Sequence, residues 1–340
     1  MTGGRMRAEM LEQPAALRRH ADLFDDHVAT VRGLVRNPLA GVVFVARGSS
    51  DNAAVYGRYL AELASGRPAG LAAPSLYTLY DTRAHYAGFL VVAISQSGAT
   101  PEIVTVCRRL RNAGARTVAV VNDADSPLAG AVDAVLPVDA GPELAVPATK
   151  TVTGQMLAVA AVAAAIGSVP FTGAELGAMP AAVDLVLADP EPANALAASW
   201  SGAERLFVVS RGLLYAAALE AALKIKETTG ILAEGISAAD LRHGPIGVAR
   251  GDVPVLVLDG GGPARDDLRA VAELARERGA PVALCSDAPD AELPLPDGVP
   301  EALAVFPATV RAQQLALALA DARGLEPDAP EGLTKVTPTQ

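Results

Sequence analysis

The feature that most restricts the fold of this chain is a set of apolar segments that recurs at one spacing. Three pairs of segments begin 164 residues apart: FVARGSS at Phe44 and VVSRGLL at Val208, VVAISQSG at Val91 and VLVLDGGG at Val255, and RTVAVVND at Arg116 and APVALCSD at Ala280. Each of these segments runs into a turn. Three apolar segments in one register predict that the chain contains two copies of one structural unit.

The apolar segments are continuous rather than alternating, which is typical of parallel strands covered by helices on both faces. The strands predicted in the first copy are GVVFVA, FLVVAI, TVAVV and AVLPV, and those in the second copy are RLFVVS, VPVLVL, PVALC and ALAVF. We therefore predict an α/β fold with two tandem doubly wound αβα parallel-sheet domains, at residues 37–166 and 195–325. A helical arm (1–36), a helical linker (167–194) and a C-terminal tail (326–340) complete the predicted organisation.

Charge and cysteine content limit the classes of partner. The net charge of −10 disfavours nucleic acid as a partner, because a phosphate backbone needs a basic face. Cys107 and Cys285 are far apart and give no disulfide framework, which favours a reducing cytoplasm. The first residues lack a signal peptide, and the longest apolar run, from Met156, is shorter than the ~20 residues that a membrane span needs. We expect a cytoplasmic protein without a membrane or nucleic-acid partner.

Hydroxyl side chains cluster at the carboxyl ends of two neighbouring predicted strands. Ser49 and Ser50 follow the first strand, and Ser95, Ser97 and Thr100 follow the second. Ligands of open parallel sheets bind at these ends, where helix N-termini present unsatisfied N–H groups. The hydroxyl groups could instead cap the next helices, but five of them exceed that need. The pattern favours a phosphate or phosphosugar site.

Nucleotide-binding motifs are absent, because the chain contains neither G-x-G-x-x-G at ARGSSDNA nor G-x-x-x-x-G-K-[ST]. The second copy has Asp259-Gly260-Gly261-Gly262 where the first has Ser95-Gln96-Ser97-Gly98. An aspartate at this point repels phosphate. We therefore expect one phosphate site per chain, in the first copy.

The second copy carries a different set of polar residues. Glu220, Lys224 and Glu227 are spaced i, i+4 and i+7, so they share one helical face, and His243 follows in the turn LRHGP. A carboxylate, a lysine that keeps it ionised and an imidazole can form a general acid/base set. A solvated ion pair on a surface helix and a surface histidine are the alternative, and the residues alone leave both open.

No metal site is predicted, because the other histidines lack acidic neighbours at ligand spacing. These histidines are His20, His27 and His85.

Seven motifs, in their order along the chain, resemble those of the sugar isomerase (SIS) family. They are ARGSS, SQSGAT, GPELAVPATK, LEAALKIKE, AEG, LRHGP and LTKVT. The similarity extends from about Asn37 to Thr337. Within this family, the chain resembles the isomerase half of glucosamine-6-phosphate synthase and the second-type glucosamine-6-phosphate deaminases.

The resemblance implies a binding role for eight residues. Those expected to hold the phosphate are Ser50, Ser95, Gln96, Ser97 and Thr100, with Ser49 near the sugar and with Glu143 and Val146 in a loop that forms one wall.

The resemblance also implies four catalytic residues. Glu227 would carry a proton between C1 and C2 of the sugar, with Lys224 beside it, and His243 would open the ring. Lys335 would form an imine with fructose 6-phosphate, as the tail lysine does in the synthase. No metal or organic cofactor is implied, and the family pattern implies a homodimer with shared active sites.

Two departures from the synthase pattern bear on the reaction. No glutaminase half with a cysteine nucleophile is recognised, and Arg47 and Ala148 replace a Cys-Gly pair and a serine of the synthase. The resemblance then favours a glucosamine-6-phosphate deaminase, which converts glucosamine 6-phosphate and water to fructose 6-phosphate and ammonia. The alternatives are an aldose–ketose isomerase of another phosphosugar, an aminotransferase subunit that receives ammonia from a separate glutaminase, and a non-catalytic sugar-phosphate sensor.

Overall fold

The computed structural model of the chain describes residues 3–80 and 82–335. These residues form two compact units, each built on one β-sheet. The first-sheet unit comprises Ala15–Glu143 and Lys150–Pro170, and the second-sheet unit comprises residues 3–14, Leu144–Thr149 and Phe171–Lys335. The second-sheet unit therefore includes two segments, residues 3–14 and Leu144–Thr149, that are distant in sequence from its strands.

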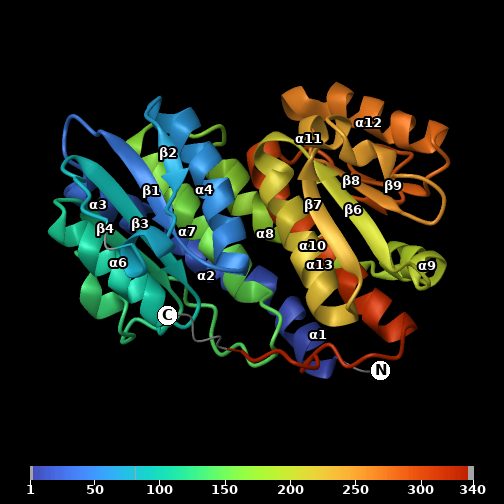
Figure 1. Ribbon diagram of the computed structural model, residues 1–340, viewed down its shortest axis with the longest axis horizontal. Helices are drawn as coiled ribbons and strands as arrows, with labels where there is room; N and C mark the ends of the chain where they lie inside the picture. Colours follow the sequence, from blue (N-terminus) through green and yellow to red (C-terminus); the bar gives the residue numbers. More distant parts are fainter. Residues whose placement is uncertain (1–2, 81, 336–340) are drawn as a thin grey trace. The chain divides into compact units, whose positions relative to one another are not determined.

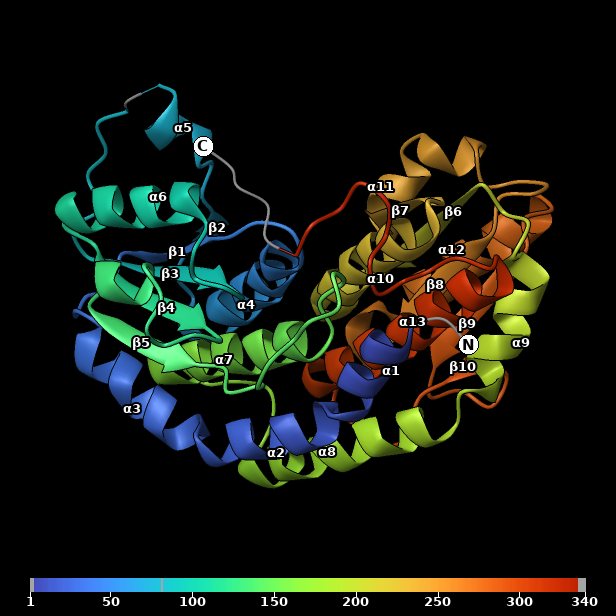
Figure 2. The same cartoon turned by 90° about the horizontal axis from the view of Figure 1, so that it is seen from below.

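The first-sheet unit contains a five-stranded parallel sheet of order β2-β1-β3-β4-β5. Its strands are β1 (Gly41–Val45), β2 (Ala69–Leu71), β3 (Phe89–Ser95), β4 (Arg116–Val121) and β5 (Ala134–Pro137). Its helices are most of α2 (Gln13–Asp22), then α3 (Phe24–Leu34), α4 (Ser49–Ser65), α5 (Ser75–Thr78), α6 (Pro101–Asn112), the 3-10 turn Ala129–Ala131, and α7 (Lys150–Ile166). Figure 2 shows α5 and α6 on one face of this sheet and α3 and α7 on the other.

Helix α4 lies unusually close to its sheet because Gly57 faces the ring of Phe44 in β1. A Cβ atom at Gly57 would lie 2.8 Å from Phe44 Cε1. This close approach matters for the site, since α4 begins at the carboxyl end of β1 with Ser49.

The second-sheet unit contains a parallel sheet of order β10-β9-β8-β6-β7. Its strands are β6 (Arg205–Ser210), β7 (Leu232–Ser237), β8 (Val255–Asp259), β9 (Val282–Ser286) and β10 (Leu293–Pro294). Its helices are α1 (Gly4–Leu11), α8 (Gly173–Ala188), α9 (Glu191–Trp200), α10 (Tyr215–Thr229), α11 (Ala238–Arg242), α12 (Arg265–Glu277) and α13 (Glu301–Ala322), with 3-10 turns at Gly212–Leu214, Pro245–Gly247 and Gly262–Ala264. Helices α11 and α12 cover one face of the sheet and α10 and α13 the other (Figure 1).

The register of the two sheets confirms the duplication. Equivalent pairs, related by the 164-residue spacing, are Val42 with Ala69 and Leu206 with Ala233, and Phe44 with Val92 and Val208 with Leu256. The fourth strand departs by one residue: Val92 pairs with Val118, whereas Leu256 pairs with Ala283. The predicted fold class, with two tandem parallel-sheet domains of the αβα type, is confirmed.

The predicted strand ALAVF is wrong, because these residues lie in α13. A continuous apolar run has no period that separates a buried strand from a buried helix, and the side chains from Ala302 to Ala320 are all buried. Helix α13 is also long and apolar enough to cross a membrane by length and composition. In the structure 94% of that stretch is buried, so α13 forms part of the core of its unit.

Candidate active site

The predicted phosphate-binding hydroxyl groups lie at the ends of two adjacent strands. Strands β1 and β3 are hydrogen-bonded neighbours, and Ser49 and Ser50 open the helix after β1. Ser95 is the last residue of β3, with Gln96, Ser97 and Thr100 in the loop that follows. The chain proceeds from β1 to β2 on one side and to β3 on the other, so this is the point where the strand order reverses and where such sheets bind ligands.

The loop after β3 is held by its own serines rather than by a helix cap. Ser95 Oγ accepts a hydrogen bond from the Gly98 N–H at 3.1 Å, and Ser97 Oγ accepts one from the Ala99 N–H at 3.2 Å. Thr100 is the N-cap residue of α6, yet its side chain accepts no hydrogen bond from the first turn. Capping therefore does not account for the Thr100 hydroxyl, and the first N–H groups of α6 remain directed at this loop.

Gly98 is required by this geometry. Its φ is 59°, and a Cβ atom there would collide with the Ser126 side chain.

An ion pair that sequence reasoning missed joins the two hydroxyl loops. The Arg47 guanidinium, in the loop after β1, binds the Glu102 carboxylate with two hydrogen bonds of 3.0 Å. Glu102 lies in the first turn of α6 and is buried, so without Arg47 its charge would oppose an anion at that helix end. Arg47 also acts on Asp51 in α4: burial raises the pKa of Asp51, and the Arg47 charge opposes that rise. The sequence showed Arg47 in the motif ARGSS, but it did not indicate that Glu102 would be the partner of Arg47.

The loop residues Glu143 and Val146 both make anchoring contacts. The buried Glu143 carboxylate accepts the Thr151 N–H at 3.1 Å and the Thr151 hydroxyl at 2.6 Å, which fixes the start of α7. The Val146 N–H donates to the Asp328 carbonyl at 2.9 Å. Their predicted contact with a sugar remains a prediction.

The acid/base residues lie on α10 and are mostly buried. Glu220 is 0% exposed and Lys224 is 1% exposed, with 3.5 Å between Lys224 Nζ and Glu220 Oε1. Lys224 Nζ also contacts the carboxylate of Glu227, which is 22% exposed. The alternative of a solvated surface pair is therefore wrong for Glu220 and Lys224. The buried Lys224 ammonium therefore lies between two carboxylates. Of these, only the Glu227 carboxylate is exposed enough for solvent or a ligand to reach it.

His243 and Lys335 belong to the same second-sheet unit. His243 is exposed at the C-terminal end of α11, and its Nδ1–H donates to the Ala239 carbonyl at 2.8 Å. This bond leaves Nε2 as the ring atom that can exchange a proton. Lys335 is half-buried and is the last described residue, so the final residues of the predicted tail lie outside the described part of the chain.

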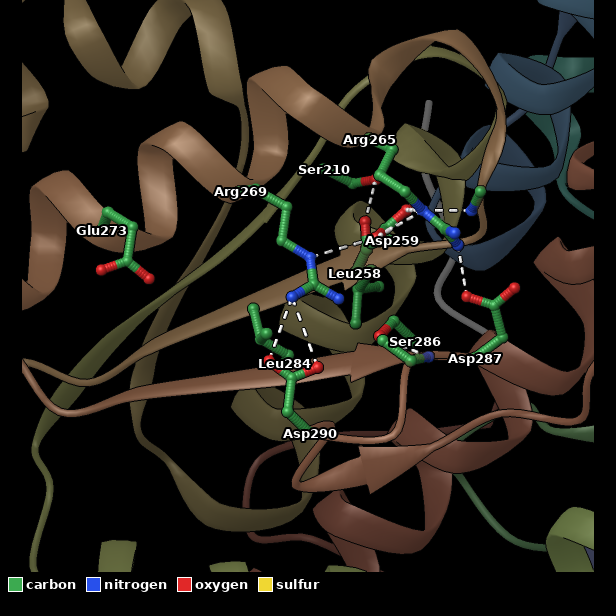
Figure 3. A network of polar contacts seen from close by, with 12 residues as sticks. Ser210, Leu258, Asp259, Arg265, Arg269, Glu273, Leu284, Ser286, Asp287 and Asp290 are labelled. Carbon is green, nitrogen blue, oxygen red and sulfur yellow. Dashed lines mark hydrogen bonds and ion pairs between the residues drawn. The ribbon is translucent and has the colours of Figure 1, made fainter.

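The second copy has an ion network at the place that corresponds to the phosphate loop (Figure 3). Asp259 ends β8 as Ser95 ends β3, and it is 1% exposed. Its carboxylate accepts the Gly261 N–H at 2.9 Å and lies 3.2 Å from Arg265 Nε and 3.8 Å from Arg269 Nε. The Asp259 carboxylate is thus paired with two guanidinium groups, and the expectation that the second copy binds no phosphate stays a prediction.

Among residues 3–80 and 82–335, no group of three or more His, Cys, Asp or Glu side chains is arranged to hold a metal ion.

Two parallel sheets of one topology, the first with a cluster of hydroxyl groups at its strand ends, are the arrangement that the resemblance to tandem SIS proteins predicts, and comparison with known families agrees. The family model described as SIS domain matches residues 41–165 and 199–294, so the chain belongs to the SIS family.

The glutamine–fructose-6-phosphate aminotransferase (isomerizing) of Methanothermobacter thermautotrophicus is 32% identical over 338 residues, covering 97% of this chain and 56% of that protein. The chain thus spans about half the length of the curated relatives it matches.

Among solved structures, one from Silicibacter pomeroyi, described as a phosphosugar isomerase, is 34% identical with a TM-score of 0.87. It covers 96% of this chain and 100% of that chain. A glucosamine-6-phosphate deaminase from Thermotoga maritima shares the fold, with 21% identity, a TM-score of 0.81, and coverage of 99% and 100%.

Proposed function

We propose that the chain is a phosphosugar aldose–ketose isomerising enzyme, and specifically a glucosamine-6-phosphate deaminase. The observation that carries the proposal is the buried series Glu220, Lys224 and Glu227, which ends in a partly exposed carboxylate. Burying an ammonium ion and a carboxylate disfavours folding unless both are well paired. Because a buried ion pair adds little to the stability of the fold, a chemical role explains the presence of Glu220, Lys224 and Glu227 better than a structural one.

Each proposed step uses a residue whose surroundings suit it. His243 Nε2 accepts the proton of the sugar C1 hydroxyl and returns a proton to the ring oxygen, which opens the ring. Glu227 then takes the proton from C2 and delivers it to C1, while the C2 amine loses one proton and the C1 oxygen gains one, so that the aldehyde becomes a hydroxyl group and the amine a ketose imine. Water adds to the imine carbon, and ammonia leaves to give fructose 6-phosphate. Acid/base steps of this kind each contribute on the order of 10²–10⁴-fold.

The phosphate group is proposed to bind where β1 and β3 end. Ser50, Ser95, Gln96, Ser97 and Thr100 supply donors there, with Ser49 toward the sugar. The Arg47–Glu102 pair supports this role, because it neutralises a carboxylate at the start of α6.

Two other reactions have specific support. The aminotransferase relatives favour an isomerising subunit that takes up ammonia, and the Silicibacter structure, matched along its whole length, favours isomerisation of another phosphosugar. The ARGSS motif with Arg47 is the reason for placing deamination first. A sensor without catalysis would have no use for the buried Lys224 beside Glu227.

The test is a panel of hexose and hexosamine 6-phosphates in which release of ammonia and aldose–ketose conversion are measured separately. Deamination predicts ammonia and fructose 6-phosphate in equal amounts from glucosamine 6-phosphate. Glu227→Gln should lower kcat by about 10²–10⁴-fold. Glu273→Gln, which changes an exposed carboxylate on α12 in the same unit, should leave it unchanged. Ketose formed from a neutral sugar without ammonia release would instead assign the chain as an isomerase, and binding without turnover would assign it as a sensor.

A further inference from the structure

The first helix holds a loop that has no secondary structure of its own. Glu9 in α1 is buried, and its carboxylate accepts the N–H groups of Leu144 and Ala145; the distances from the Ala145 nitrogen are 3.3 Å to each oxygen. A buried carboxylate needs such donors, and bonds to an ionised acceptor are the strong ones. The loop backbone is therefore fixed from α1.

The same helix is capped by the start of the C-terminal tail. Asp328 Oδ2 accepts the Arg5 N–H at 2.9 Å and Oδ1 accepts the Met6 N–H at 2.8 Å, in the first turn of α1. The residue at the N-cap position, Gly3, provides no side-chain cap. A carboxylate at a helix N-terminus is favourable, so the tail is bound where α1 needs an anion.

The loop and the tail are also bonded to each other. The Val146 N–H donates to the Asp328 carbonyl at 2.9 Å, and Glu326 Oε1 accepts both the Gly3 N–H and the Asp328 N–H at 3.1 Å. The three segments thus share one hydrogen-bonded junction inside the second-sheet unit. Apolar contacts support it through the buried cluster of Met6, Met10, Ala145 and Leu317.

We propose that α1 is a positioning element, in which Glu9 and Asp328 hold the loop that contains Val146 and the root of the tail that carries Lys335 in one arrangement. This inference rests on the proposed function and on what the family resemblance implies, namely that Val146 lies in a loop forming one wall of the site and that Lys335 acts on the sugar. Neither segment belongs to a sheet or helix that could order it. Six residues lie between Asp328 and Lys335, so the junction limits the reach of the tail.

The experiment compares Glu9→Ala, Glu9→Gln and Asp328→Ala. Asp321→Asn is the control, because it removes the ion pair of 2.9 Å between Asp321 and Arg7 of the same helix and leaves Glu9 and Asp328 in place. For Glu9→Ala and Asp328→Ala we expect kcat to fall by about ten- to a hundredfold, since small misplacement of a site is costly. KM should change little, because the phosphate donors belong to the other unit. Glu9→Gln, which keeps an acceptor oxygen, should recover part of the lost kcat, and the control should match the parent.

Hydrogen exchange of backbone amides provides a readout that does not need turnover. Glu9→Ala should speed exchange at residues 144–146, where Glu9 accepts the Leu144 and Ala145 N–H groups, and also in the tail at 329–335. Faster exchange in the loop alone would overturn the inference, as would a folded Glu9→Ala protein with parental kcat. If the parent protein releases no ammonia from any sugar, the proposed function fails, and joint exchange of loop and tail still decides whether α1 couples them.

Discussion

Thr100 is the residue at which phosphate binding can be tested with least disturbance of the fold, because its side chain makes no capping bond to α6. A hydrogen bond to a charged oxygen contributes about 1.5–3 kcal/mol. We expect Thr100→Ala to raise KM for the phosphosugar roughly ten- to a hundredfold and to weaken inhibition by inorganic phosphate. Ser97→Ala should act in the same direction. Unchanged KM and unchanged phosphate inhibition in both variants would show that this loop is only a structural turn.

A second residue-scale prediction concerns stability against acid. His20 is buried in the first-sheet unit, with Nδ1 donating to the Val138 carbonyl at 2.9 Å and its ring 5.0 Å from that of His27. Burial and, less strongly, the His27 charge lower the pKa of His20 to about 4, although the Val138 bond and Asp139 oppose this. Burial also lowers the pKa of His27, with Asp26 opposing.

The unfolded chain therefore binds a proton at His20 below about pH 6.5, whereas the folded chain does so only near pH 4. The free energy of unfolding should fall as pH drops through this window, by on the order of 3 kcal/mol from His20. Urea unfolding between pH 4 and 7.5 measures it. In His20→Asn, which keeps a donor for Val138, the slope should be smaller; an unchanged slope would exclude His20 as its source.

Single residues also mark the limit of what the sequence could predict. The spacing of Glu220, Lys224 and Glu227 was sufficient to place them on one helical face, but burial decided between a surface pair and a core group. Arg47 and Glu102 are 55 residues apart, and their contact exists only because β1 and β3 are neighbours. Contacts of this kind depend on the completed sheet.

At the scale of elements, local pattern predicted the long buried strands well and the atypical ones badly. Strand β7 (LAEGIS) contains a charged residue and a glycine, and β2 and β10 are only three and two residues long. Such segments are strands because of their neighbours in the sheet and not because of their own preference. The residues ALAVF show the converse, since α13 is helical in spite of strand-like composition.

The C-terminal tail is an element whose role can be tested by removing it. Residues after the Asp328 junction contribute no strand or helix up to Lys335, so deletion of Leu333–Gln340 should leave the unfolding transition unchanged. We expect this deletion to abolish turnover, because it removes Lys335. Full activity in the folded, truncated protein would exclude Lys335 from the mechanism.

At the scale of the whole molecule, the recurrence of apolar segments was sufficient to predict two sheets of the same topology. It could not predict the one-residue shift at β9, because register depends on the length of the connection as well as on the apolar pattern. Nor could it show that Asp259 is enclosed by Arg265 and Arg269. The two copies share a fold but differ in what their strand ends hold.

The expected homodimer can be tested by complementation between inactive chains. We predict that the Glu227 and the His243 that act on one sugar come from different subunits, as in two-fold dimers that share their sites. Glu227→Gln and His243→Asn should each be nearly inactive. Unfolded and refolded together, they should form mixed dimers with one intact site, and activity should return well above either parent. Mixed dimers confirmed by mass but still inactive would place both residues in one chain.

The buried Glu220–Lys224 pair of α10 implies that a change which stabilises the protein would also remove its proposed activity. Replacing a buried ion pair with apolar side chains of similar volume is often neutral or stabilising by about 1–4 kcal/mol, whereas removing one partner destabilises by about 3–5 kcal/mol. We therefore expect Glu220→Leu with Lys224→Met to melt at or above the parental temperature, and Lys224→Met alone to melt well below it. Neither variant should turn over substrate. Selection for stability alone would favour replacement of Lys224, so its presence in the core is consistent with the chemical role proposed for it.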